Sequence, residues 1–422
     1  MHKKVLTALT LLSGTLALAQ TKIGDCVKMA CEHYPQMQEY ELIEATEKND
    51  LSNAALGWVP RVSISGKATW QSEVVEMPFD IPGMEFNIPH DQYGITADVT
   101  QPIWDGGSSA SKKANAVAGA EVKRSQLAVN MYSIRQQIQN TCLAILLTDR
   151  QLEQNALLKE NLQRGINEVH ALLTNGMACQ SDLDQLEVNL LSCTQQEKQL
   201  KADRKSYERV LTLMTGQQME GVTIVPDEFN PELASDAIGS GQNGRPEMIL
   251  YEAQSKQVEA HRRQLNSNIS PKLNLTLQGG YGRPGMNMLS GEFSPYFVAG
   301  VRLQWDLGSL YTLKNDRNKN NSDARKVQIS KESFLLNNAV EAEKKLSEIE
   351  KAREVLASDD EIVNLRQSIR ESGEHQYNQG VLKMNDYLSM LDDEHKARLD
   401  RSIHEIQLLM AEYDLYNTLG IN

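Results

Sequence analysis

Apolar residues recur along the first long proline-free stretch at the spacing of a coiled-coil helix. Residues 103–225 contain no proline, and within them apolar side chains return at steps of seven, with others between the steps. At ~1.5 Å of rise per residue, a helix over residues 108–173 would be roughly 100 Å long. No ordinary globular domain contains such a rod, so we expect the rod itself to be the architecture. The apolar seam comprises Leu127, Met131, Ile134, Ile138, Ile145 and Leu152.

A second apolar seam predicts that this rod turns once and returns. Asn175 and Gly176 are typical of a helix end, and Ser181 and Asp182 are suited to cap the next helix. Apolar residues then follow at helical spacing. We therefore expect a helical hairpin over residues 108–214. The return seam comprises Leu183, Leu186, Leu190, Cys193, Leu200, Tyr207, Leu211 and Met214.

The same layout occurs twice in the chain, as shown by sequence elements that reappear about two hundred residues later. We expect residues 20–226 and 227–422 to be two copies of one structural unit, in which a helix and two strands precede a long helical hairpin. In the second copy the helix covers residues 246–268 and the hairpin residues 309–419. The matching elements are Pro-X-Met at 35–37 and 246–248, Trp-Asp at 104–105 and 305–306, and Gly176 and Gly380.

Four short segments alternate between apolar and polar residues, with a mismatch at Gln101. Val62 and Ile64, for example, alternate with Ser63 and Ser65. Segments of about ten residues with this alternation and aromatic residues near their ends are typical of strands in an outer-membrane barrel. A pair of half-buried hairpins in a soluble protein is the alternative. The predicted strands are residues 60–73, 91–104, 271–282 and 293–306.

Four strands are too few to close a barrel, because the smallest bacterial barrels use about eight. Open strand edges are not tolerated in lipid, where each unpaired backbone group costs several kcal/mol. If the strands cross a membrane, several copies of the chain must share one barrel. The predicted fold class is therefore mainly α with a membrane β-barrel, built from long coiled-coil hairpins and strand pairs.

The first 19 residues resemble a secretory signal peptide. A basic start at Lys3 and Lys4 precedes an apolar core over residues 5–18, and Ala17 and Ala19 provide a small-residue cleavage site. The core is too short to favour a membrane-spanning helix. We expect the mature chain to be exported.

Charge and composition exclude several classes of function. The formal net charge is -13, whereas a nucleic-acid-binding protein presents a basic face. The five cysteines are odd in number and indicate no disulfide framework. Residues 392–395 (DDEH) are interpreted as a solvated helix face rather than a metal site. No phosphate loop or catalytic constellation is recognisable, so we expect neither an enzyme nor a cofactor.

The two hairpin ends, residues 174–182 and 377–386, together with the duplicated layout, make the chain similar to the TolC-like outer-membrane factor family. This resemblance covers essentially the whole mature chain. It implies a homotrimer with a twelve-stranded barrel on a twelve-helix periplasmic tunnel. It also implies outer-membrane lipid, a periplasmic adaptor and an inner-membrane transporter as partners.

The resemblance further implies two kinds of site at the hairpin ends. One is an adaptor-docking surface, and the other is a gate at the periplasmic entrance, where the aspartates act as a charged ring or only as helix caps. The docking residues are Asn175, Gly176, Met177, Gln379, Gly380 and Val381. The gate residues are Asp182, Asp386 and Tyr377.

The sequence is thus interpreted as a passive outer-membrane duct of a tripartite efflux system for small toxic compounds. Type I protein secretion and a soluble periplasmic coiled-coil adaptor are the alternatives. Residues 75–91 and 282–292 join paired strands and are expected to be extracellular loops. Residues 215–245 are expected to be a linker between the two copies.

Overall fold

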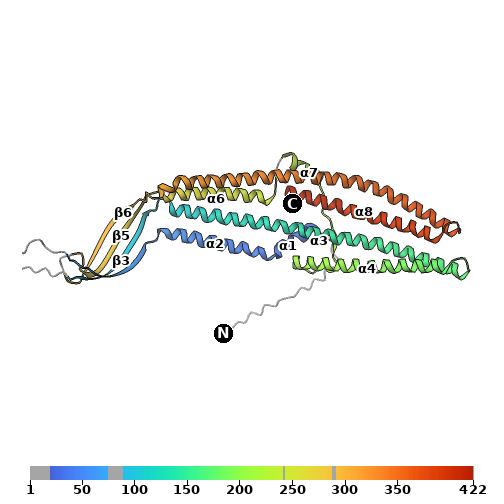
Figure 1. The fold of residues 1–422 in the computed structure, drawn as a ribbon, viewed down its shortest axis with the longest axis horizontal. Helices are drawn as coiled ribbons and strands as arrows, with labels where there is room; N and C mark the ends of the chain where they lie inside the picture. Colours follow the sequence, from blue (N-terminus) through green and yellow to red (C-terminus); the bar gives the residue numbers. More distant parts are fainter. Residues whose placement is uncertain (1–19, 75–88, 241–242, 288–290, 422) are drawn as a thin grey trace, which may run out of the picture. The chain divides into compact units, whose positions relative to one another are not determined.

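The computed structural model describes residues 20–74, 89–240, 243–287 and 291–421, and Figure 1 shows its helices and strands along the chain. The expected signal segment lies outside the described residues, as do residues 75–88 and 288–290 of the expected extracellular loops. Everything below concerns the described part.

Four long helices dominate the structure: α3 (Ser108–Thr174), α4 (Gln180–Thr215), α7 (Ser309–Asn378) and α8 (Met384–Leu419). The seam residues Ile138 and Ile145 are completely buried, which agrees with the coiled-coil spacing. Within the described ranges, every helix is too polar or too short to cross a membrane on its own.

The start of α3 is fixed by a capping aspartate. The carboxylate of Asp105 accepts hydrogen bonds from the backbone N–H of Gly107 at 3.0 Å and of Ser109 at 2.6 Å. Asp306 does the same for α7, since it accepts the N–H of Gly308 at 3.0 Å. These three contacts satisfy backbone donors that a helix start leaves unpaired.

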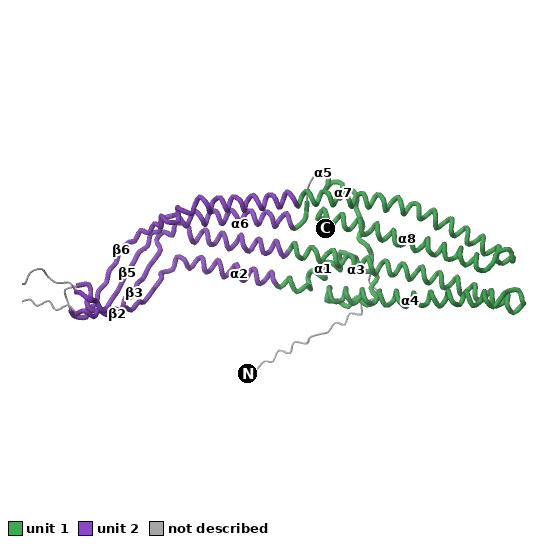
Figure 2. The backbone as a smooth tube through the Cα atoms, viewed as in Figure 1, with its two compact units in different colours: residues 1–38, 128–246, 334–422 green, residues 39–127, 247–333 purple. Residues whose placement is uncertain are grey.

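The chain forms two compact units, and each unit contains segments from both predicted copies. The first comprises residues 1–38, 128–246 and 334–422, and the second comprises residues 39–127 and 247–333. Figure 2 colours them green and purple. The long helices α3 and α7 contribute to both units.

The second unit contains an antiparallel sheet of four strands in the order β2-β3-β5-β6. The strands are β2 (Arg61–Trp70), β3 (Asp91–Trp104), β5 (Lys272–Arg283) and β6 (Ser294–Gln304). The central pairing of β3 with β5 joins the two copies, and a bulge interrupts it between Pro102 and Trp104. Strands β2 and β6 are the two edges.

The register sorts the sheet's side chains onto two chemically different faces. Val62 pairs with Val99, and Val99 pairs with Leu277, so these residues share one face. Ser63 and Asp98 pair on the other. The apolar face is exposed in the isolated protomer. Its most exposed members are Val62, Ile64, Trp70, Ile95, Phe297, Val301 and Leu303, each at 63% exposure or more.

The second unit also contains two shorter helices, α2 (Gln38–Ala55) and α6 (Pro246–Asn268). Asn115 at the start of α3 donates to Gln264 of α6 at 2.9 Å, and Arg124 pairs with Glu47 of α2 at 2.6 Å. Each short helix is therefore bonded to α3.

In the first unit, the expected linker folds into two elements. It contains β4 (Thr223–Val225), which pairs in parallel with β1 (Gln20–Lys22), and α5 (Pro231–Ser240). Helix α5 packs through Ala234 in a core cluster with Leu415 of α8. The described part of the expected linker thus contains regular structure that packs on the rest of the first unit.

One aspartate of this region connects three segments of the first unit. The carboxylate of Asp227 accepts a hydrogen bond from the backbone N–H of Gly24, in the first turn of α1 (Ile23–His33), at 2.9 Å. Asp227 accepts another from the hydroxyl of Tyr413 in α8 at 3.1 Å. Its own N–H donates to the Tyr413 hydroxyl at 2.8 Å. Burial raises the pKa of Tyr413 far above its usual value, so this hydroxyl stays protonated as a donor.

Candidate functional site

The two hairpin turns, which carry all the predicted docking residues, have the same backbone geometry. In the first, Met177 N–H donates to Leu172 at 2.9 Å and Gly176 N–H to Leu173 at 3.0 Å. In the second, Val381 and Gly380 repeat both bonds, each at 2.9 Å, to Gln376 and Tyr377. This bond pair defines the Schellman helix end.

The glycine of each turn is required by the backbone. Gly176 has φ of +70° and Gly380 has φ of +73°, a left-handed conformation that side chains disfavour. The apolar residue that follows each glycine is exposed, Met177 at 68% and Val381 at 74%. Asn175 and Gln379, which precede the glycines, are exposed as well. Both turns therefore present one apolar side chain to the solvent.

The two predicted gate aspartates differ in their contacts. The Asp182 carboxylate accepts the N–H of Cys179 at 3.4 Å, in a capping box at the start of α4. The carboxylate of Asp386 lies in the first turn of α8 and is exposed, and within the described residues it makes no hydrogen bond or ion pair. Helix capping explains Asp182 but does not explain Asp386.

Tyr377, the third predicted gate residue, stacks on a second tyrosine. The ring centroids of Tyr377 and Tyr387 are 5.7 Å apart, with 15° between the ring planes. Burial, followed by the nearby charge of Asp182, raises the pKa of Tyr377, and burial raises that of Tyr387 to about 12. Tyr387 was not singled out from the sequence, although its position directly after Asp386 could have indicated it.

Below the turns, the two hairpins pack on one apolar core in the first unit. The core contains side chains of α3, α4 and α8, and both stacked tyrosines lie against it. The stack and the turns are thus held on a common support. The buried members are Leu158, Leu162, Val169, Leu183, Leu186, Cys193, Met384, Leu388 and Leu391.

Next to this core lies a buried carboxylate that sequence analysis misinterpreted. Glu394 is only 5% exposed, so the interpretation of residues 392–395 as a solvated face is wrong for this residue. Its carboxylate oxygens accept hydrogen bonds from Arg370 at 2.9 Å and from Arg398 at 2.7 Å. Arg370 also forms an ion pair with Glu374 at 2.7 Å. Burial opposes the charge, but the two arginines outweigh it and lower the pKa of Glu394. Arg398 follows Glu394 by four residues on the same helix, but Arg370 comes from α7, and a long-range partner of this kind leaves no local sequence signal.

Cysteine exposure singles out one thiol at the first turn. Cys179 is exposed, whereas Cys26, Cys142 and Cys193 are buried and Cys31 is half-buried. None of the five forms a disulfide.

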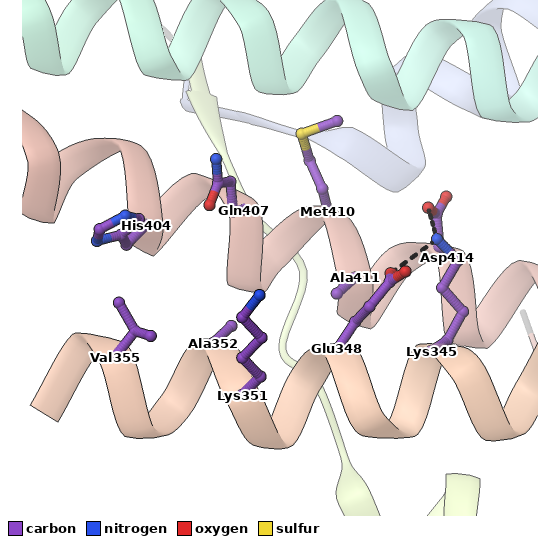
Figure 3. A pocket seen from close by; sticks show the side chains of 10 residues that line it. All are labelled: Lys345, Glu348, Lys351, Ala352, Val355, His404, Gln407, Met410, Ala411 and Asp414. Atoms are coloured by element: carbon purple, nitrogen blue, oxygen red, sulfur yellow. Dashed lines mark hydrogen bonds and ion pairs between the residues drawn. The ribbon is translucent and has the colours of Figure 1, made fainter.

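A groove runs along the surface between α7 and α8 (Figure 3). On one side Lys345 bridges Glu348 at 2.9 Å and Asp414 at 3.1 Å. Val355 and Met410 contribute apolar surface. The groove shows no arrangement of nucleophile, base and oxyanion donors. In the part of the chain that the structure describes, no cluster of His, Cys, Asp and Glu is suited to hold a metal.

Comparison with known proteins agrees with the architecture. Residues 27–217 match the family model for outer membrane efflux proteins. The fold resembles that of the outer membrane protein VceC from Vibrio cholerae, with a TM-score of 0.68 at 11% identity, over 94% of this chain and 96% of that one. None of the curated protein sequences matches the chain significantly.

Two further solved structures share the fold. The CmeC outer membrane channel of Campylobacter jejuni matches with a TM-score of 0.66 at 12% identity, over 94% of this chain and 85% of that one. The MtrE outer membrane channel of Neisseria gonorrhoeae, in its open state, matches with a TM-score of 0.64 at 12% identity. The match covers 94% of this chain and 88% of that one. These neighbours are channels and not enzymes. Residues 27–217 are thus similar to the outer membrane efflux protein family, and the described chain has the fold of outer-membrane channels.

Proposed function

We propose that three copies of the chain close a twelve-stranded barrel on a twelve-helix tunnel, and that this duct passively conducts small toxic compounds out of the cell. A periplasmic adaptor and an inner-membrane transporter complete the system, and the transporter supplies the energy. The observation that carries the proposal is the four-stranded sheet, which has an exposed apolar face and open edges at β2 and β6.

Lipid would accept the apolar face of this sheet but not its edges, because unpaired backbone groups cannot be solvated there. Pairing β6 of one protomer with β2 of the next removes every edge when the ring closes. The polar face then lines a water-filled channel.

The test is fractionation combined with electrophysiology. We expect heat-modifiable trimers in detergent extracts of the outer membrane, and discrete conductance when the purified protein is added to planar bilayers. A soluble periplasmic monomer without conductance would instead support the coiled-coil adaptor or scaffold.

The hairpin turns are proposed to dock the adaptor through their exposed apolar residues. Replacing Met177 and Val381 with glutamate should reduce crosslinking to the adaptor at least about tenfold, because a charge cannot be buried in an apolar contact without a partner. Both side chains are exposed in the protomer and outside its apolar cores, so each protomer should fold as before, and the amount of trimer is measured in parallel.

The matched control for docking is Ser206→Glu, an exposed position on α4 away from the turns. This variant should crosslink like the unmodified protein. If the variant with both Met177 and Val381 replaced still crosslinks fully to the adaptor, the docking surface lies elsewhere on the protein.

The gate is proposed to consist of Asp182, Asp386 and Tyr377 from each protomer. Three copies of an exposed carboxylate near one axis would attract cations and repel one another. The Tyr377 hydroxyl makes no hydrogen bond within the described residues of the protomer, so a bond across to a neighbour could hold the closed state.

Neutralising the gate should change ion selectivity. We expect Asp386→Asn to lower the cation preference measured from reversal potentials in a salt gradient, and Asp182→Asn to lower it further while also weakening the α4 cap. Asp184→Asn, an exposed acid on the same helix, is the control. If all three variants keep the original selectivity, Asp182 is only a helix cap and Asp386 has no gating role.

A further inference from the structure

The polar face of the four-stranded sheet carries an excess of positive charge, although the chain as a whole is acidic, with a net charge of -13. The strand register assigns four cations and one acid to this face. The remaining charged strand residues, Asp91 and Arg283, lie on the other face and form an ion pair with each other. The cations are Arg61, Lys67, Lys272 and Arg302, and the acid is Asp98.

Three of these cations lie at the end of the sheet where the strands join the helices. Arg61 and Lys272 are the first residues of β2 and β5, and Arg302 lies near the end of the antiparallel β6. In the register of β5 and β6, Lys272 lies opposite Gln304, and Asn274, two residues after Lys272, lies opposite Arg302. Lys272 and Arg302 are therefore diagonal neighbours on the same face. Lys67 lies towards the opposite end of β2. We call Arg61, Lys272 and Arg302 the basic collar.

The basic collar has no counter-charge of its own. None of its three residues forms an ion pair within the described part of the chain. The one acid on the face, Asp98, accepts hydrogen bonds only from neutral donors, Gln278 at 2.7 Å and Thr96 at 3.4 Å, so a single negative charge faces four cations. Asp306, beyond the end of β6, binds Gly308 and Ser309 as the cap of α7. Grouped cations without partners repel one another unless an anion lies among them.

Closure of the barrel would concentrate this charge. Arg61 and Arg302 lie on the two edge strands, both towards the helix side of the sheet. In a closed ring, β6 of one protomer lies beside β2 of the next, so Arg302 approaches Arg61 of the neighbouring copy. Rings of arginine and lysine at a constriction favour anions.

We propose that the basic collar is a binding site for anionic groups at the helix-side mouth of the barrel, and that the compounds leaving through it are organic anions. This inference rests on the proposed duct and adds the chemical class of its cargo. Carboxylate, sulfate or phosphate groups would bind the guanidinium and ammonium groups through charge-assisted hydrogen bonds.

The experiment uses the full trimer in planar bilayers, with inorganic tripolyphosphate as the probe on the barrel side. We expect tripolyphosphate to block the current through the original protein. In the variant with Arg61, Lys272 and Arg302 all changed to glutamine, the same block should require a tripolyphosphate concentration at least about tenfold higher. The charge-conserving variant, Arg61→Lys with Lys272→Arg and Arg302→Lys, should be blocked like the original. Asp98→Asn should be blocked at a lower concentration.

The outcomes separate this inference from the proposed function. Normal conductance with the same block in the glutamine variant would overturn the basic collar and leave the duct intact. Absence of conductance in the unmodified trimer would overturn the duct itself. If the triple variant fails to assemble, each single glutamine variant should still weaken the block by about twofold or more, and three unchanged single variants would overturn the basic collar.

Discussion

Ile64→Arg should abolish the trimer in the outer membrane, whereas Ser63→Arg, on the adjacent residue, should leave it assembled. Ile64 lies mid-strand on the apolar face and is 76% exposed in the protomer. In the closed barrel this side chain would contact lipid, where an arginine costs about 2–4 kcal/mol near the bilayer midplane. Three copies would multiply that cost. Heat-modifiable trimers in outer-membrane fractions are the measurement.

The control is informative because it introduces the same residue one position away. Ser63 faces the proposed lumen and pairs with Asp98, which a lumenal arginine could approach. Equal loss of trimer in both variants would mean that bulk or charge in β2, rather than contact with lipid, decides assembly. Normal assembly of Ile64→Arg would show that the apolar face does not meet lipid.

Glu394→Ala should be the most destabilising single change in the helical hairpins. The substitution leaves Arg370 and Arg398 beside a site that has lost its buried charge, and breaking a buried pair in this way costs about 3–5 kcal/mol. Urea unfolding of the detergent-solubilised protein, followed by far-ultraviolet circular dichroism, is the measurement. Glu371→Ala is the control. The Glu371 side chain is 51% exposed and lies 3.5 Å from Arg370, so its loss should cost about 0–1 kcal/mol.

The contribution of Glu394 should also depend on pH. Its pKa is lower in the folded protein than in the unfolded chain, because Arg370 and Arg398 outweigh the effect of burial. Its stabilising effect is therefore complete above the unfolded pKa of about 4.3 and is lost as the pH falls through the folded pKa. The stability difference between the original protein and Glu394→Gln should be constant near neutral pH and shrink in strong acid. A difference that does not change with pH would show that the carboxylate charge is not what stabilises the hairpin.

The regular elements could be predicted from the sequence because each repeats one pattern over many residues. The heptad spacing places Ile138 and Leu211 in the core, and both are completely buried. The alternation in β2 separates Ile64 from Ser63, as the observed register requires. Helix α6 covers the expected residues 246–268.

The remaining elements depend on contacts between residues far apart in the chain. The three residues of β4 carry no periodicity, and they form a strand because β1, about two hundred residues earlier, lies beside them. Helix α5 is short and gains its stability from packing against α8. The sequence likewise could not show that Asp182 caps a helix while Asp386 does not, since both follow a turn glycine at similar spacing.

The exposed thiol of Cys179 provides a natural attachment point for a fluorophore. It lies in the first hairpin turn, three residues after Gly176, and the other thiols are less accessible. In a trimer, three such dyes would surround the periplasmic aperture, so energy transfer among them would fall as the aperture widens. Opening could then be followed from a native residue, with Cys31→Ser as the only substitution needed to suppress background labelling.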